Sequence, residues 1–300
     1  MHNHFLPART AQDIDKHVAK ILRELGDPYP PLRLELVREL LRLDLGFYSS
    51  ADHGIIAESV HRLVVSGKQI YARPSLVWDA IKKLDLKALW IPDRKRILLD
   101  KELPDLKKRW GEAHEIGHSI IPWHDSVMHG DVKQTLSLTC EQQVEAEANY
   151  AAGRLLFLQD QFLEQLFDSP LSFDGVKKLS KVFGNTMTST LWRAVESSPN
   201  ISFALVSGHP KEPVGDDPVR YYVRSRSFST QFSGVSGMQV YRSLQRFCRR
   251  GRGPIGKDLV HFRDSSTVDH EFLVECFFNG HETLTIGVYQ HGRVAAVSVM

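Results

Sequence analysis

The sequence predicts an α+β protein, with helices through roughly the first 200 residues and a mainly antiparallel sheet after them. Two observations predict this class. Apolar residues recur at helical spacing on both sides of a histidine-rich motif, whereas the C-terminal stretches alternate as strands do. A chain of 300 residues with 42% hydrophobic residues is long enough for two domains with ample core.

Composition excludes several classes of protein. The formal net charge of +2 is near balance and does not indicate nucleic acid. Cys140, Cys248 and Cys276 are scattered and odd in number, which favours neither a disulfide framework nor a cysteine metal site. The N-terminus lacks the blocks of a signal peptide, and no apolar run approaches the roughly 20 residues of a membrane span. We therefore expect a soluble, cytoplasmic protein without a membrane partner.

Two amphipathic helices are expected first, over residues 10–25 and 32–43, separated by a break rich in glycine and proline at 26–31. Next, residues 87–91 and 96–99 predict a β-hairpin. Such a hairpin can offer a strand edge to an extended peptide, or it can be purely structural. Both interpretations stay open.

The central motif follows this hairpin. His114-Glu115-Ile116-Gly117-His118 matches the pattern H-E-x-x-H. Pro104 near its start and Pro122 after it favour a helix between them. Residues four apart on a helix share a face, so His114 and His118 can point at one metal ion. Glu115 could then take a proton from a zinc-bound water, whose pKa is about 7. The alternative is an ordinary amphipathic helix with two histidines near its surface.

A third ligand is predicted on a second helix, which Thr139 would cap at its N-terminus. Glu145 lies beside the apolar stripe of this helix, so it is the third ligand that we predict. Asn149, one turn further, could hydrogen-bond a ligand histidine and set its tautomer. Glu147 lies about 200° from Glu145 at about 100° per residue, and we expect it to face water.

Together, the His-Glu-Ile-Gly-His motif and the segment Glu145-Ala-Glu-Ala-Asn149 resemble the ImmA/IrrE family of bacterial metallo-endopeptidases. The resemblance covers about residues 10 to 200 and implies a compact zinc-peptidase domain, a minimal version of the thermolysin-like (zincin) fold. It also implies that His114, His118 and Glu145 bind Zn²⁺, that Glu115 is the general base and that Asn149 orients a ligand. The substrate it implies is a helix-turn-helix transcriptional repressor, cut in response to stress.

Three further residues near the motif were considered for the site. His124 and His129 could join the site or stabilise an oxyanion, although surface histidines in a loop are the more ordinary interpretation. Tyr150 is adjacent to Asn149, but helical phase turns it about 100° away. We place none of the three in the catalytic set.

Residues 176–195 read as helix, a turn near Gly184-Asn185, and helix, which resembles a helix-turn-helix. Thr188 to Arg193 would occupy the recognition position. Such a pair could read DNA or dock a repressor, but few basic side chains lie on its second helix, which favours a scaffold role. Direct nucleic-acid binding is therefore not our primary expectation, and no DNA-binding residues are assigned.

Residues 206–218 are rich in proline and glycine and indicate a linker or a long loop. Beyond them, strands are expected over 271–278, 283–289 and 293–299, as an antiparallel meander. The arginine- and glycine-rich stretch 249–253 could touch phosphate, or it could be a solvated loop.

The predicted organisation is a zinc metallopeptidase domain with N-terminal helices over 1–170, a helix-turn-helix-like segment over 171–205 and a C-terminal α+β domain, with a sensory role open to it, over 206–300. The predicted function is a zinc-dependent endopeptidase that cleaves a specific protein, a repressor by the resemblance, in a stress or mobile-element response. Two alternatives remain. One is a non-cleaving regulator that binds DNA or a repressor and holds structural zinc, and the other is a component of a toxin–antitoxin pair.

Overall fold

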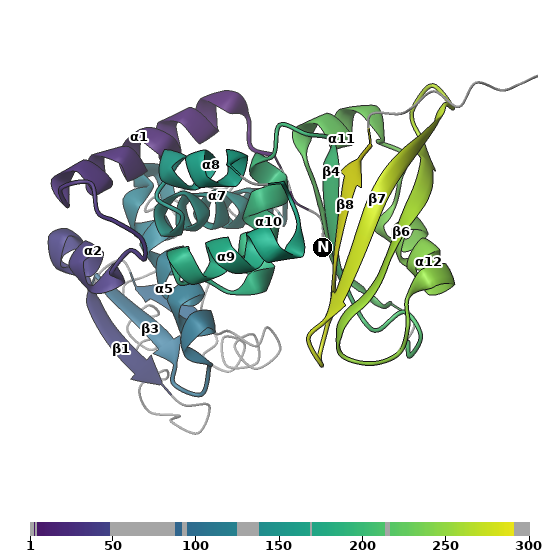
Figure 1. Cartoon of the computed structure of the whole chain (residues 1–300). Coiled ribbons are helices and arrows are strands. Elements are labelled where there is room, and N and C mark those ends of the chain that lie inside the picture. The colour runs from purple at the N-terminus through teal and green to yellow at the C-terminus, as the bar shows by residue number, and fades with distance from the viewer. Residues whose placement is uncertain are drawn as a thin grey trace, which may run out of the picture. The chain divides into compact units, whose positions relative to one another are not determined.

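The computed structural model describes residues 3, 5–48, 88–91, 95–124, 138–168, 170–213 and 217–290 (Figure 1). The chain forms two compact units. The helical unit comprises Leu6–Phe162 and Val182–Asn185, and the sheet unit comprises Met1–Phe5, Leu163–Lys181 and Thr186–Met300. These bounds are not those of the three domains predicted from the sequence, which remain a prediction.

The helical unit begins with the two expected helices, α1 (Ala8–Glu24) and α2 (Leu34–Leu41). Helix α1 buries Ile14, Val18, Ile21 and Leu22, the side chains whose spacing predicted it. Helix α2 is shorter than predicted, because Arg42 adopts a left-handed conformation with φ of 55° and ends it.

A three-stranded sheet follows, with strand order β1-β3-β2. Its strands are β1 (Asp44–Tyr48), β2 (Ala88–Ile91) and β3 (Arg96–Asp100). Strands β2 and β3 are antiparallel, with Trp90 opposite Ile97, which confirms the predicted hairpin. Strand β1 pairs with β3 in parallel, so β2 forms one edge of this sheet among the strands that the structure describes.

Helix α5 (Asp105–Ile120) packs on β2 and β3, and it also packs against α7 (Leu138–Leu156), which in turn contacts α1. Helix α5 starts directly after Pro104, and Ile121 before Pro122 is extended, as its position before a proline favours. The predicted cap at Thr139 is wrong, because Leu138 already belongs to α7. After α7 the chain continues into α8 (Asp160–Phe167).

The sheet unit is built on five antiparallel strands in the order β5-β4-β8-β7-β6. They are β4 (Ser202–Ser207), β5 (Val219–Arg224), β6 (Gly253–Arg263), β7 (Asp269–Phe278) and β8 (Thr283–Tyr289). Two of the predicted strands, β7 and β8, are confirmed. The predicted strand at 293–299 lies outside the described residues, and β4, β5 and β6 were not assigned from the sequence.

The proline- and glycine-rich stretch was interpreted as a linker or a long loop. Strands β4 and β5 on either side of it are neighbours in this sheet, so it connects two strands of one sheet, which favours the long loop. The described strands form an open sheet with β5 and β6 at its edges, not a closed barrel.

Helices α9 (Phe173–Phe183) and α10 (Met187–Ser197) precede the sheet, and α11 (Arg226–Gln231) and α12 (Gly237–Phe247) connect β5 to β6. The last two were not predicted, although Ser236 and Gln239 form a capping box that opens α12. Tyr222 joins the aromatic core beneath α12, whereas its neighbour Tyr221 meets Trp192 of α10 at 5.6 Å between ring centroids. Successive side chains of a strand point to opposite faces, so α10 and α12 cover opposite faces of the sheet.

Within the part of the chain that the structure describes, no helix combines the length and apolar character needed to cross a membrane.

Candidate metal centre

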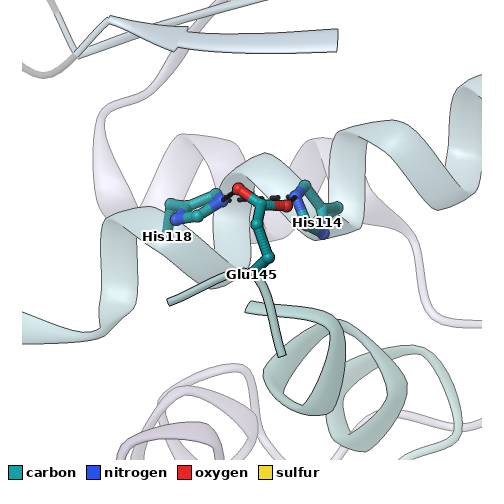
Figure 2. Close-up of side chains that lie close together, drawn as sticks. All are labelled: His114, His118 and Glu145. Atoms are coloured by element: carbon teal, nitrogen blue, oxygen red, sulfur yellow. Dashed lines mark hydrogen bonds and ion pairs between the residues drawn. The ribbon is translucent and has the colours of Figure 1, made fainter. Parts of the chain in front are cut away.

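Helix α5 carries the two histidines of the H-E-x-x-H motif one turn apart, as the helical period requires. Their Nε2 atoms face each other at 3.2 Å (Figure 2). His118 is 3% exposed, and His114 is partly covered. The two imidazoles therefore converge on one point beside the helix.

Glu145 reaches the same point from helix α7 (Figure 2). Its Oε2 lies 3.2 Å from Nε2 of His114, and its Oε1 lies 3.5 Å from Nε2 of His118. The close approach of the two helices depends on Gly117, where a Cβ atom would lie 2.7 Å from the carbonyl oxygen of Ala148. Only glycine fits there, so the sequence of the motif allows α7 to bring Glu145 to the histidines.

The charges of the three side chains are strongly coupled. Burial raises the pKa of Glu145, but the adjacent imidazoles of His114 and His118 outweigh it and hold that pKa far below its ordinary value. Burial lowers the pKa of both histidines. For His118 the net pKa stays below the ordinary value, whereas Glu145 and Glu115 raise that of His114 above it.

The donor set fits a divalent metal ion of the zinc type. Donors about 2.1 Å from a tetrahedral ion lie about 3.4 Å apart. The two imidazole nitrogens lie 3.2 Å apart, and they lie 3.2 and 3.5 Å from two different oxygens of Glu145, distances close to that spacing. Two imidazole nitrogens and a carboxylate also form a donor set common at catalytic zinc. Among the described residues, His114, His118 and Glu145 are the group that could hold a metal ion.

Two other predicted residues lie beside this group. Glu115 is 5% exposed on α5, directly after His114. Asn149 lies one turn after Glu145 on α7, with its Oδ1 atom 3.1 Å from Nδ1 of His114. An amide oxygen is an acceptor, so Nδ1 of His114 carries the hydrogen and its Nε2 is left free to bind a metal. All five predicted residues are thus close together, while their chemical roles remain predictions.

The comparison with protein families agrees with the motif. Residues 74–194 match the family model described as the IrrE N-terminal-like domain, Peptidase_M78. The chain carries an ImmA/IrrE domain. This match contains every predicted site residue and extends through helices α9 and most of α10.

Among solved structures, a Mycobacterium tuberculosis transcriptional regulator is similar, with a TM-score of 0.52 and 11% sequence identity. The similarity covers 96% of this chain and 93% of that chain. At such low identity it concerns the fold alone. No curated protein matches the chain.

The helix-turn-helix-like segment of the ImmA/IrrE domain has the predicted form, two helices joined at Gly184, whose φ is 63°. Half of the recognition position on the second helix is buried. Thr190, Leu191 and Arg193 in the recognition position are buried, and helix α10 packs on β4 and β5. This burial favours the scaffold interpretation.

The expectation that Glu147 faces water is wrong. Its side chain is 2% exposed, and it accepts hydrogen bonds from Trp123 Nε1 at 2.6 Å and from Gln143 Nε2 at 2.8 Å. The helical period correctly predicted that Glu147 lies on a different face of α7 from Glu145. It could not show that the chain after α5 folds back over this second face.

The interpretation of His124 as a surface histidine is also wrong, because its side chain is completely buried. Its Nδ1 atom lies 3.1 Å from Nδ1 of His118, and its Nε2 atom lies 3.0 Å from Oε2 of Glu147. A signal for this was present in the sequence, since Pro122-Trp123 directly before it predicts a turn that would bring His124 back toward the helix.

His129 and Tyr150 were also left out of the catalytic set. His129 lies outside the described residues. The hydroxyl group of Tyr150 hydrogen-bonds the carboxylate of Asp15 on α1, at 3.1 and 3.2 Å from its two oxygens. Tyr150 thus contacts α1, a contact that was not predicted, and it stays outside the catalytic set.

Proposed function

We propose that the chain is a zinc-dependent endopeptidase that hydrolyses a peptide bond in a specific protein. One observation carries this proposal: the Nε2 atoms of His114 and His118 lie 3.2 Å apart, each within 3.5 Å of an oxygen of Glu145, and the buried Glu115 directly follows His114. Structural zinc sites use four protein ligands, whereas catalytic sites use three and keep one position open. The three donors found among the described residues match the catalytic case.

In this proposal His114, His118 and Glu145 hold the ion, and Asn149 orients His114 through its Nδ1–H group. Zinc, when bound, supplies a Lewis acid that acidifies water and polarises a peptide carbonyl. Glu115 accepts the proton of the attacking water and later delivers it to the leaving amine. The edge strand β2 could bind the extended substrate by strand addition, and a purely structural hairpin remains its alternative. The thermolysin-like arrangement of this core is part of the proposal.

For the substrate we propose a helix-turn-helix transcriptional repressor, cut in a stress or mobile-element response. The family resemblance supports this choice, and the similar solved structure is named a transcriptional regulator. Burial of helix α10 argues against direct reading of DNA by this chain. The C-terminal part of the chain would then serve regulation, in the sensory role that the resemblance suggests.

The metal content of the purified protein tests this function first. We expect about one zinc per wild-type chain by elemental analysis, and loss of that zinc in Glu145→Ala, because two donors do not retain the ion. A wild-type protein that takes up no zinc when zinc is supplied would contradict the proposal. The zinc-loaded protein is then incubated with purified helix-turn-helix repressors encoded beside it, and cleavage is read by intact mass.

The name of the similar structure also favours a second candidate, a non-cleaving regulator in which zinc is structural. The two candidates differ in one measurement. That measurement is repressor cleavage. The peptidase cleaves the repressor and loses this activity in Glu115→Gln, whereas the non-cleaving regulator shows no cleavage, and its zinc content and repressor binding do not change in Glu115→Gln.

A further inference from the structure

Behind the candidate metal centre, a chain of buried hydrogen bonds extends from His118 away from the metal-facing side. Nδ1 of His118 lies 3.1 Å from Nδ1 of His124, whose Nε2 lies 3.0 Å from Oε2 of Glu147. The exposed fractions of these three side chains are 3%, 0% and 2%. Water therefore does not compete for these contacts, and each nitrogen must be matched by the neighbour that the fold provides.

The hydrogen positions follow from the partners of Glu147. The indole nitrogen of Trp123 is only a donor, so Oε2 of Glu147 accepts at 2.6 Å. The amide nitrogen of Gln143 is also a donor, so Oε1 accepts at 2.8 Å. Donors that face both oxygens stabilise the charged form of Glu147. A carboxylate can only accept, so Nε2 of His124 donates to it.

A neutral His124 that donates through Nε2 has a bare Nδ1, which can only accept. Nδ1 of His118 is the group that faces it, so His118 carries its hydrogen there. The Nε2 atom of His118 is then left with a free lone pair. This is the atom that faces Nε2 of His114 and the carboxylate of Glu145.

We propose that Glu147 and His124 are positioning residues, which hold His118 in the tautomer whose Nε2 atom can bind the metal. The inference rests on the proposed function, in that it takes His118 as a metal ligand. Hydrogen-bond partners behind a ligand histidine fix its tautomer and ring orientation, and their loss typically weakens metal binding about 10- to 100-fold.

The two ligand histidines are thus supported differently. His114 is held by Asn149, a neutral amide on an exposed part of α7. His118 is held by a carboxylate acting through a second imidazole, all of it buried. In an alternative arrangement, both nitrogens of His124 carry hydrogen. Nδ1 of His118 would then accept a hydrogen bond, Nε2 of His118 would carry the hydrogen, and Nε2 could not bind a metal.

Zinc affinity of the full-length protein tests the inference, with Zn²⁺ alone as the probe in competition with a chromophoric chelator. We expect Glu147→Gln and His124→Ala to bind Zn²⁺ about 10- to 100-fold more weakly than the wild type. Trp123→Phe is the matched control, because it removes a hydrogen bond to the same carboxylate but leaves the chain from Glu147 to His118 intact. Its affinity should stay within about threefold of the wild type.

Equal affinities in Glu147→Gln, His124→Ala and Trp123→Phe would overturn the inference while leaving the proposed function in place. A wild-type protein that binds no Zn²⁺ would overturn the proposed function itself, and this inference with it, so the two failures are distinguishable.

A second measurement needs no variant and therefore does not depend on the stability of one. Long-range ¹H–¹⁵N NMR spectra of the zinc-loaded wild type report which imidazole nitrogen carries hydrogen. We expect hydrogen on Nδ1 of His118 and on Nε2 of His124, with Nδ1 of His124 bare. Hydrogen on Nδ1 of His124 would overturn the inference.

Discussion

The helical unit and the sheet unit bury very different side chains. Around α5 and α7 the helical unit buries Glu115, His118, His124, Glu147 and Arg154. Beneath α11 and α12 the sheet unit buries an apolar cluster rich in aromatic rings, including Phe203, Phe228, Phe232 and Phe272. Their centroids are closely spaced, with 5.0 Å between Phe228 and Phe232 and 5.1 Å between Phe232 and Phe272.

This difference shows two ways to stabilise an interior. Aromatic rings need volume and shape, so the sheet unit should be sensitive to the removal of side-chain atoms. Buried charges need partners, so the helical unit should be sensitive to the loss of a single hydrogen-bonding group even when volume is unchanged. Only the helical unit has its polar groups next to three metal donors, which is where its chemistry is expected. The following predictions separate the two cases, beginning with the largest effect.

The largest effect is expected from an isosteric change in the helical unit. Glu115→Gln should retain zinc but lower the rate of cleavage by about 10²- to 10⁴-fold, since it removes the general base. Zinc content by elemental analysis and repressor cleavage by intact mass measure the two outcomes. The matched change in the sheet unit is Glu275→Gln on β7, whose carboxylate pairs with Lys257 on β6, and neither outcome should change. Full cleavage by Glu115→Gln would refute the role of this residue.

Removal of side-chain volume should have its main effect in the sheet unit. Phe272→Ala in the sheet unit removes a fully buried ring and should lower the free energy of unfolding by about 3–5 kcal/mol, without weakening zinc binding. Chemical denaturation and a zinc titration of the same sample measure both. Phe167→Ala is the control, since this ring is 60% exposed and should cost less than about 0.5 kcal/mol. A Phe272→Ala protein that unfolds like the wild type would contradict the aromatic-core account.

A smaller but coupled effect is expected where the two metal helices touch. In Gly117→Ala the new methyl group would lie 2.7 Å from the backbone oxygen of Ala148, so α7 must move away from α5. We expect about 1–3 kcal/mol of destabilisation together with weaker zinc binding, because Glu145 moves with α7. Gly234→Ala in the sheet unit places its methyl group in open space and should change neither property. Undiminished zinc affinity in Gly117→Ala would show that the helix contact does not position Glu145.

The smallest effect is a dependence on pH at Glu147 in the helical unit. Burial raises the pKa of Glu147, but hydrogen bonds from His124, Trp123 and Gln143 outweigh it and hold the pKa below the ordinary value of 4.5. The native carboxylate thus takes up a proton less readily than the unfolded one. Its contribution to stability is complete above about pH 4.5 and is lost as the pH falls through the lower native pKa.

Hydrogen exchange of the zinc-free protein, read by mass spectrometry and corrected for the intrinsic rate, measures this locally. Protection of α7 should weaken in acid, whereas the strands around the aromatic core, which contains no carboxylate or histidine, should respond less. Glu147→Gln should reduce the response of α7, to which Glu145 also contributes. If the protection of α7 in this variant weakens in acid as it does in the wild type, another titratable group causes the response.

Most of the candidate site could be predicted because its information is local. The four-residue spacing of His114 and His118 places them on one face of any helix, and the same period places Asn149 one turn from Glu145. The hairpin before α5 and strands β7 and β8 were predictable for the same reason, since alternation and turn residues act over a few positions. Helices α11 and α12 were missed although α12 has a capping box, because the C-terminal region was interpreted through its strands alone.

By itself, the sequence determined which residues share a helix face, where prolines stop α5 and which side chains have the chemistry to bind zinc. Only the tertiary structure decided what covers each face. Helical phase turned Glu147 away from Glu145, but it contains no information on the neighbour that a second face meets. That neighbour is the turn after α5, which brings His124 and Trp123 onto α7 and buries the carboxylate between them. The contact joins residues more than 20 positions apart, so it depends on how two helices pack and not on the local period of either one.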